Sequence, residues 1–160
     1  MRTVIVIRLL LSFLTALRMS YFALDDETKA RTPIEVKTWV CGMDQETFAF
    51  FSSVVEAESD RGQSNEGRIL IALTILNRVE SDNWPSSISG VITQSGQFTV
   101  YYAGIYKSVG RTSLSDMAIV EAWKWKQEEH PNVIYFNSIG FFPGYEPYKY
   151  ADGNYFSLGG

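Results

Sequence analysis

The chain reads Val-Val-Glu-Ala-Glu-Ser over residues 54–59 and Glu-Gly-Arg-Ile-Leu-Ile-Ala-Leu-Thr-Ile-Leu-Asn-Arg-Val over residues 66–79. The first run ends a stretch without Gly or Pro that follows Asp44, a residue type that caps helix N-termini well. The second run is apolar around most of a helical circumference, which is typical of a buried helix. The sequence therefore predicts a helix over residues 45–59 and, beside it, a buried central helix.

Helical periodicity places the two glutamates of the first run on different faces. Phe48, Phe51 and Val55 recur at spacings of three and four, so they share one face of the helix. Glu58 continues that face, whereas Glu56 lies about 200° away around the axis. Glu58 is thus expected to face the core or a cleft, and Glu56 to face water or a polar neighbour.

The position predicted for Glu58 favours a protonated carboxyl group. Burial disfavours the ionised form, and so does the partial negative charge at a helix C-terminus. Both effects raise the pKa of Glu58, which is the direction that the general acid of a glycosidase needs. The alternative is that Glu58 forms a structural ion pair between two helices, with Arg61, Arg68 or Arg78 as its partner.

Composition limits the class of protein. With 160 residues, 46% of them hydrophobic and 14% aromatic, the chain has enough apolar material for one globular domain with a core. The formal net charge of −4 at pH 7 argues against nucleic-acid binding, because phosphate contacts require a basic face. We expect the protein to be a monomer.

Residues 1–23 have the pattern of a signal peptide. A basic start is followed by a short apolar run over residues 9–17, which is too short to span a membrane. Cleavage after Ala23 would place Tyr21, an unfavourable residue, at position −3. We expect residues 1–23 to be a signal peptide or an N-terminal extension, residues 24–160 to form the functional domain, and the protein to be secreted.

Cysteine and histidine are too scarce for a metal cage. Cys41 and His130 are the only residues of their types, so we expect neither a zinc site built from Cys and His ligands nor a cofactor. A nucleophilic pair of Cys41 with His130 is compatible with the sequence. Alternatively, Cys41 is a small buried apolar residue.

Turn and capping signals divide the rest of the chain. The expected elements are, in order, a central helix from Ser64 or Asn65, a short helix over 86–93, a strand or loop edge over 99–102, a long helix capped around Ser113 or Ser115, and a short strand over 132–137. The long helix is expected to stop at His130-Pro131. From Gly140 onward, aromatic residues are interleaved with Gly, Pro and Asn. Such a loop either lines a saccharide groove, where rings stack on sugars, or closes the core over the helices.

Several short motifs together resemble one protein family. The motifs Val-Val-x-Ala-Glu, Arg-Gly, Glu-Gly and Leu-Asn-Arg-Val within residues 54–79 are similar to those of bacterial cell-wall hydrolases of the spore cortex-lytic enzyme type. So are the motifs Gly96-Gln97-Phe98, Tyr135-Phe136-Asn137 and Gly153-Asn154-Tyr155-Phe156. They occur in the family's order and extend over about residues 47–157.

The resemblance implies a mainly helical α+β fold, a lysozyme-like single domain with a small β element. It also implies cleavage of peptidoglycan strands between N-acetylmuramic acid and N-acetylglucosamine, and a location outside the cell or at the cell wall. Several members of the family are lytic transglycosylases. In these, one carboxyl group protonates the leaving oxygen and then, as a carboxylate, deprotonates the C6 hydroxyl of the muramoyl sugar, which closes a 1,6-anhydro ring. The family's catalytic glutamate lies in the Ala-Glu motif and corresponds to Glu58.

The resemblance also suggests substrate contacts. Glu66 matches the Glu-Gly motif and would support the acid or orient the substrate, although a charge at a helix N-terminus is an equally good explanation. The residues expected to contact or orient the glycan are Glu66, Gln97, Phe98, Tyr135, Asn137, Asn154 and Tyr155.

Three positions depart from the family pattern. Gln63 stands where the family usually has Glu after Arg-Gly, Asp60 lengthens the spacing between the matched glutamates by one residue, and Tyr155 replaces a frequent His. Two other functions stay open. A non-catalytic glycan-binding module would keep the groove without turnover, and a cysteine peptidase or amidase would use Cys41 and His130.

Overall fold

Helix α5 (Glu66–Glu80) lies at the centre of the computed structural model, which describes residues 2–59, 64–128 and 130–159. Every side chain from residue 70 to residue 78 is buried, as its apolar circumference predicts. Helices α4 (Gln45–Glu58), α6 (Ile88–Ile92) and α9 (Ser113–Gln127) and strand β1 (Val133–Asn137) pack around it. The core of the domain therefore forms around α5.

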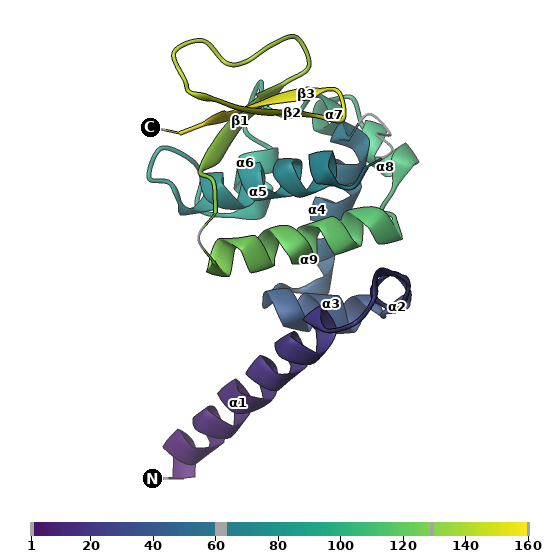
Figure 1. Cartoon of the computed structure of the whole chain (residues 1–160), viewed down its shortest axis with the longest axis vertical. Coiled ribbons are helices and arrows are strands. Elements are labelled where there is room, and N and C mark those ends of the chain that lie inside the picture. The colour runs from purple at the N-terminus through teal and green to yellow at the C-terminus, as the bar shows by residue number, and fades with distance from the viewer. Residues whose placement is uncertain (1, 60–63, 129, 160) are drawn as a thin grey trace.

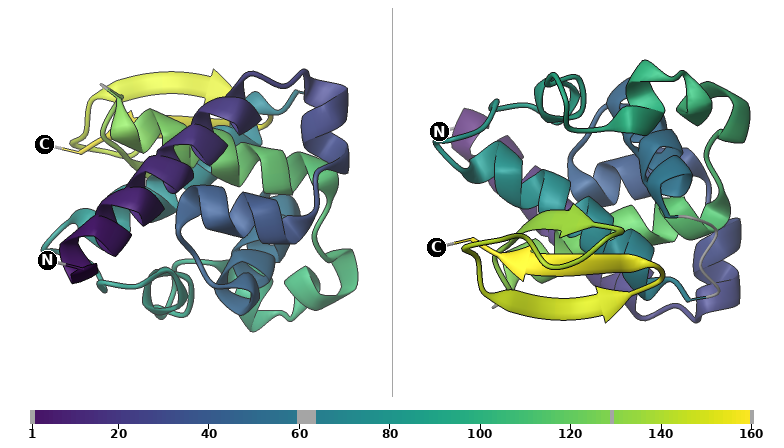
Figure 2. Two further views of the ribbon diagram at one scale, coloured as in Figure 1. Left: turned by 90° about the horizontal axis from the view of Figure 1, so that it is seen from below. Right: turned by 90° about the horizontal axis from the view of Figure 1, so that it is seen from above.

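The arrangement is a mainly helical α+β fold, which confirms the predicted fold class (Figure 1). The other helices are α1 (Arg2–Phe22), α2 (Asp26–Arg31), α3 (Ile34–Cys41), α7 (Thr99–Tyr102) and α8 (Ile105–Val109). The strands β2 (Pro147–Ala151) and β3 (Asn154–Leu158) complete a small antiparallel sheet in the order β1-β3-β2, which lies over α5 when seen from above (Figure 2).

Several predicted element boundaries are confirmed. Asp44 caps α4, because its carboxylate accepts a hydrogen bond from the Thr47 N–H at 2.8 Å. Asn65 precedes α5, and the predicted short helix and first strand are both present. Helix α9 begins slightly earlier than predicted: Thr112 is the N-cap, in a reciprocal capping box with Ser115.

Two segments differ from the prediction. Residues 99–102 form the helical turn α7 and not a strand or loop edge, because Tyr101 packs against Phe50 and Tyr106 in the helical layer and outweighs the β propensity of the segment. The segment after Gly140, predicted as a loop, contains the hairpin β2–β3. Its turn uses Asp152 at φ 46° and Gly153 at φ 86°, the positive values that a tight hairpin turn needs.

The C-terminal end of α5 binds the first strand. Asn77 donates a side-chain hydrogen bond to the Val133 carbonyl oxygen at 2.8 Å, and Arg78 Nε donates to the Ile134 carbonyl oxygen at 2.8 Å. The Asn-Arg pair of the Leu-Asn-Arg-Val motif therefore fixes β1 against the central helix.

The N-terminal end of α5 binds the tip of the hairpin. The Gly67 N–H and the Ser64 hydroxyl both donate to Asp152 Oδ2, at 2.9 and 2.6 Å. A Cβ atom at Gly67 would lie only 2.6 Å from Cβ of Asp152, so this close approach requires glycine. The Lys149 ammonium adds an ion pair with Glu66. The Glu-Gly motif thus places the β2–β3 turn.

The C-terminal end of α1 contacts the domain, while its apolar beginning extends away at the end opposite the sheet (Figure 1). Arg18 donates to the Val40 carbonyl oxygen at 2.9 Å and stacks 4.4 Å from the centre of the Trp123 ring, and Tyr21 is buried. Across the described ranges, no helix has both the length and the hydropathy to cross a membrane.

Candidate functional site

Glu58 is the last residue of α4 and enters a pocket between that helix, α7 and the sheet. One of its oxygens, Oε1, is buried and has no hydrogen-bond partner among the described residues. The ion pair with Arg68 or Arg78 considered from the sequence is not formed: Arg68 pairs with Glu56, and Arg78 binds a carbonyl oxygen of β1. Arg61, the third suggested partner, lies outside the described residues, as do Asp60 and Gln63.

The surroundings of Glu58 raise its pKa to about 7. Burial is the main cause, because it disfavours the charged carboxylate. The backbone N–H of Val100, which faces the carboxylate, opposes the shift in part. At neutral pH a substantial fraction of Glu58 therefore keeps its proton, which agrees with the direction expected from the sequence.

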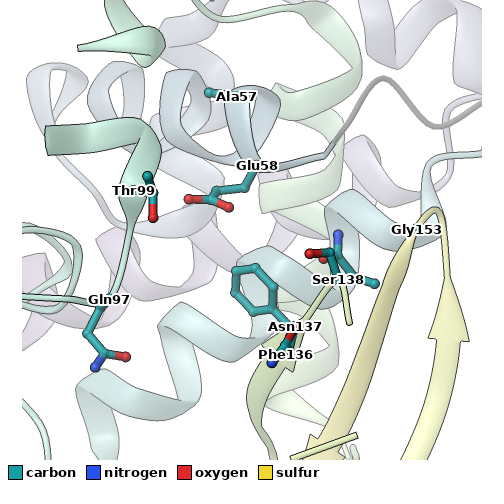
Figure 3. Close-up of a pocket in the computed structure, with 9 residues that line it drawn as sticks. Ala57, Glu58, Gln97, Thr99, Phe136, Asn137, Ser138 and Gly153 are labelled. Atoms are coloured by element: carbon teal, nitrogen blue, oxygen red, sulfur yellow. The ribbon is translucent and has the colours of Figure 1, made fainter. Parts of the chain in front are cut away.

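The pocket around Glu58 has a volume of about 420 Å³. Figure 3 shows the carboxyl group of Glu58 directed into the same space as the Phe136 ring and the Thr99 side chain. Glu58 is the only acidic side chain among the described lining residues. These residues, which define the Glu58 pocket, are Ala57, Glu58, Gln97, Thr99, Phe136, Asn137, Ser138, Gly153 and Asn154.

The Gly96-Gln97-Phe98 motif forms one wall of the pocket, because exposed and buried side chains alternate along it. Gly96 turns the chain at φ 78°, after which Gln97 and Thr99 are exposed and Phe98 is fully buried. Gln97 thus lines the pocket as expected, whereas Phe98 packs near Phe136 in the core with 6.1 Å between ring centres. Direct contact of Phe98 with a glycan, expected from the motif, is incompatible with its burial.

Two asparagines from the sheet form the opposite wall. Asn137 at the end of β1 and Asn154 at the start of β3 both line the Glu58 pocket. The Asn137 side-chain oxygen accepts a hydrogen bond from the Ile139 N–H at 2.7 Å, which orients its amide. Asn154 is 6% exposed, and its side chain makes no hydrogen bond to any residue that the structure describes. Both amides can therefore donate to a polar ligand.

Glu56 fixes the helix that presents Glu58. Its carboxylate accepts hydrogen bonds from Arg68 Nε at 2.9 Å and Nη2 at 2.8 Å, and from the Thr112 hydroxyl at 2.7 Å. The Arg68 hydrogen bonds lower the pKa of Glu56, with a smaller effect from Thr112. Glu56 thus faces polar neighbours, one of the two outcomes predicted for it, and joins α4, α5 and α9.

The other predicted glycan contacts lie outside the Glu58 pocket. Glu66 is ion-paired with Lys149 at the N-terminus of α5, beside the hairpin tip. Tyr135 lines two neighbouring pockets, stacks on Phe142 with 4.4 Å between ring centres, and its hydroxyl lies 3.0 Å from that of Tyr145. Tyr155 packs between Phe141 and Tyr150.

Three polar or aromatic lining side chains were missed from the sequence: Thr99, Phe136 and Ser138. Thr99 has a recognisable signal, since it lies two residues after Gln97 with a core residue between them. Phe136 belongs to a motif that was noted, but nothing in its type distinguishes a pocket ring from a core ring. For Ser138 we find no sequence signal.

Cys41 and His130 do not form a nucleophilic pair. Cys41 is 6% exposed, and burial raises the pKa of its thiol, so the thiolate is disfavoured. The two ring nitrogens of His130 lie 3.0 Å from the Glu128 carbonyl oxygen and 3.2 Å from Asn77 Oδ1. Within the described part of the chain, no three His, Cys, Asp or Glu side chains are placed to hold a metal ion.

Solved structures with the same fold include two catalytic domains. The catalytic domain of the Bacillus cereus SleB protein superposes with a TM-score of 0.58 at 24% identity, covering 71% of this chain and 91% of that one. The catalytic domain of the germination-specific lytic transglycosylase SleB from Bacillus anthracis gives a TM-score of 0.59 at 24% identity, covering 72% and 97%. At this identity the likeness shows the fold.

Sequence relatives and a family model give the classification. The spore cortex-lytic enzyme of Bacillus cereus is 32% identical over 97 residues, which make up 60% of this chain and 36% of that protein. The chain thus corresponds to about a third of this relative's length. The family model for cell wall hydrolases matches residues 62–147, more than half of the chain. This chain is therefore a member of the cell wall hydrolase family.

Proposed function

We propose that this protein is a peptidoglycan-cleaving glycosidase that acts on the bond between N-acetylmuramic acid and N-acetylglucosamine, with Glu58 as its catalytic acid. The observation that supports this most is Glu58 itself: a carboxyl group with a pKa of about 7, without an ion-pair partner among the described residues, in a pocket of about 420 Å³. A group that is partly protonated at neutral pH is suited to protonate a leaving oxygen.

The pocket favours a lytic transglycosylase over a two-carboxylate hydrolase. Hydrolytic glycosidases use a pair of carboxyl groups on either side of the bond. Glu58 has no acidic neighbour in the described lining, which fits a reaction in which one group acts twice. Protonated Glu58 donates to the glycosidic oxygen as the bond from that oxygen to C1 of the muramoyl sugar breaks. The Glu58 carboxylate then takes the proton of the C6 hydroxyl of the same sugar, and the C6 oxygen bonds to C1, which closes the 1,6-anhydro ring and restores the acid.

Pocket amides provide polar contacts to the sugar. Gln97, Asn137 and Asn154 line the pocket beside Glu58 and offer N–H donors for hydroxyl and acetamido groups of the glycan. The Phe136 ring presents an apolar face there, which suits the apolar face of a pyranose ring. Glu66, Tyr135 and Tyr155 are proposed to contact the glycan only beyond this pocket.

Substrate and location follow from the proposed reaction. Peptidoglycan strands lie outside the cytoplasmic membrane, so we propose that the protein is secreted or associated with the cell wall, and that residues 1–23 serve as a signal peptide or N-terminal extension. Residues 24–160 would then form the catalytic domain, acting as a monomer.

The test is mass spectrometry of muropeptides released from purified peptidoglycan by the wild type and by Glu58→Gln. Anhydro-muropeptides from the wild type alone would support the transglycosylase. Reducing-end muramic acid from the wild type alone would keep Glu58 but make the reaction a hydrolysis. Equal release by both proteins would exclude Glu58 as the acid. Binding without release by either protein would support a glycan-binding module instead.

A further inference from the structure

Arg78 is a buried cation that the proposed reaction does not use. Its side chain is 4% exposed, and its guanidinium group stacks 4.0 Å from the centre of the Trp84 ring. Nε donates to the Ile134 carbonyl oxygen at 2.8 Å and Nη1 to Gln97 Oε1 at 3.2 Å. Both acceptors are neutral, and no described carboxylate pairs with Arg78.

A buried guanidinium group without a counter-ion is an energetic cost. Burial lowers the pKa of Arg78 to about 10, which reflects the loss of hydration around its charge. Two other arginines avoid that cost, because Arg68 binds Glu56 and Arg111 binds Asp116. Nη2 of Arg78 donates no hydrogen bond to any described residue, so it is free to bind a ligand.

Arg78 lines a cavity that adjoins the Glu58 pocket. This cavity, the Arg78 pocket, has a volume of about 220 Å³, and Arg78 is the only charged residue in its described lining. Gln97 and Phe136 line both pockets and so form their common boundary. The Arg78 pocket is lined by Arg78, Gly96, Gln97, Tyr135, Phe136 and Phe142.

We propose that Arg78 binds a carboxylate group on the peptidoglycan strand, next to the sugar that occupies the Glu58 pocket. The inference rests on the proposed function, because it assigns a group of that substrate to the neighbouring cavity. A guanidinium group binds carboxylates through paired N–H donors, and apolar surroundings strengthen the interaction. The aromatic walls of the Arg78 pocket provide such surroundings.

Two carboxylates of a peptidoglycan strand fit this chemistry. One is the lactyl carboxyl group of muramic acid where no peptide is attached, and the other is a carboxyl group of the stem peptide. Both would lie beside the glycan backbone, as the Arg78 pocket lies beside the Glu58 pocket. Binding through Gln97, whose side chain accepts from Arg78 and lines both pockets, would link recognition of this group to the position of the sugar.

The experiment compares charged and neutral forms of the same strands. Native strands, and strands stripped of stem peptides by an amidase, are each assayed before and after methyl esterification of their carboxyl groups. We expect esterification to raise the KM of the wild type on the order of tenfold, as for loss of a hydrogen-bonded charge, with kcat little changed. An increase confined to stripped strands assigns the lactyl group, and one confined to native strands assigns the stem peptide.

Variants separate recognition from folding. Arg78→Met should lose the discrimination between charged and esterified strands, whereas Arg31→Met, which removes an exposed cation paired with Glu27, should keep it. Thermal unfolding of Arg78→Met reports its structural role, since Arg78 also binds β1. If this variant does not fold, the wild-type comparison can still overturn the inference, since equal KM values for charged and esterified strands exclude recognition of the carboxylate.

Equal KM values for charged and esterified strands with the wild type would overturn the inference while leaving the proposed function intact. Discrimination that persists in folded Arg78→Met would also overturn it. If the wild type cleaves no strand, the proposed reaction fails separately. Calorimetry then measures the binding of native and stripped strands, each with free or esterified carboxyl groups, to Glu58→Gln. The inference still requires a higher dissociation constant for esterified strands than for charged ones.

Discussion

Two glutamates lie two residues apart on opposite sides of the last turn of α4, and their carboxyl groups have pKa values shifted in opposite directions. Glu56 accepts hydrogen bonds from Arg68 and Thr112, and its pKa is lowered. Glu58 is directed to a pocket, has one unpartnered buried oxygen, and its pKa is raised to about 7. Both side chains are largely removed from water, so burial alone does not decide the charge of a carboxyl group.

The difference lies in the partners that the fold supplies. Arg68 on α5 reaches Glu56 with two nitrogens, which compensates for the lost hydration of both charges. Glu58 meets the Val100 N–H, which opposes the effect of burial only in part. One glutamate is thus suited to hold helices together, and the other to exchange a proton with a ligand.

The largest effect is expected from replacing the unpaired glutamate. Glu58→Gln keeps the shape but removes the transferable proton, so kcat should fall by about 10²- to 10⁴-fold, the usual range for a general acid. Release of muropeptides from purified peptidoglycan measures the rate. Glu46→Gln, on the exposed first turn of the same helix, is the matched control and should keep wild-type activity.

Replacing the paired glutamate should affect stability instead. In Glu56→Gln one partner of a buried ion pair loses its charge, so we expect the free energy of unfolding to fall by about 2–4 kcal/mol. Denaturant unfolding monitored by circular dichroism checks this value. Any remaining activity at low temperature should keep the wild-type pH dependence. A stable Glu56→Gln without activity would show that Glu56 belongs to the chemistry.

The hairpin tip should respond to a smaller change. Gly67→Ala adds a Cβ atom 2.6 Å from Asp152, so the turn must move away from α5, at a cost of about 1–3 kcal/mol. Because Gly153 and Asn154 follow Asp152 and line the Glu58 pocket, activity should fall together with stability. Ala72→Gly, a change inside the same helix but away from the hairpin, tests whether a loss of stability alone lowers activity.

The pH dependence of stability should have opposite signs for the two glutamates. For Glu58 the folded pKa of about 7 lies above the ordinary value of 4.5, so the folded state binds the extra proton and stability falls as pH rises through this window. Glu58→Gln has no carboxyl group to ionise, so its stability should not fall over this pH range. We expect its free energy of unfolding to exceed that of the wild type by about 1–3 kcal/mol at pH 8 and to differ little at pH 4.

For Glu56 the folded pKa is lowered, so its stabilisation is present at neutral pH and is lost as pH falls through the folded value. The deficit of Glu56→Gln relative to the wild type should therefore shrink in acid. Melting temperatures of both variants and the wild type, measured from about pH 2 to pH 8, check the two signs, because the Glu56 effect appears only below its ordinary pKa of 4.5. Parallel curves for all three proteins would contradict the assignment of opposite states.

Local patterns were sufficient to predict the helical layer and the position of Glu58. The periodicity of α4 depends on residues within the helix, and the helix is long enough for its faces to be distinguished. The buried circumference of α5 is also visible in the sequence, because few of its residues are polar. The capping residue Asp44 predicts the start of α4, and the start of α5 is predicted at Ser64 or Asn65, of which Asn65 directly precedes the helix.

The sheet and the far walls of the site depend on contacts between distant residues, which no local pattern contains. The aromatic residues after Gly140 obscured the Asp152-Gly153 turn signal, so the hairpin was missed. Phe98 and Phe136 have the same residue type, but one is fully buried and the other lines the pocket. That difference follows only from how α7 and β1 pack.

The central claim is that Glu58 is the acid, and titrating this residue tests it most directly. ¹³C NMR of protein labelled at glutamate carboxyl groups, with Glu58→Gln to assign the signal, gives its pKa, and kcat/KM on peptidoglycan is measured over the same pH range. We predict a Glu58 pKa near 7 and an activity that falls above that pH as the proton is lost. A Glu58 signal that titrates near 4.5, or activity that persists unchanged well above pH 7, would contradict the account.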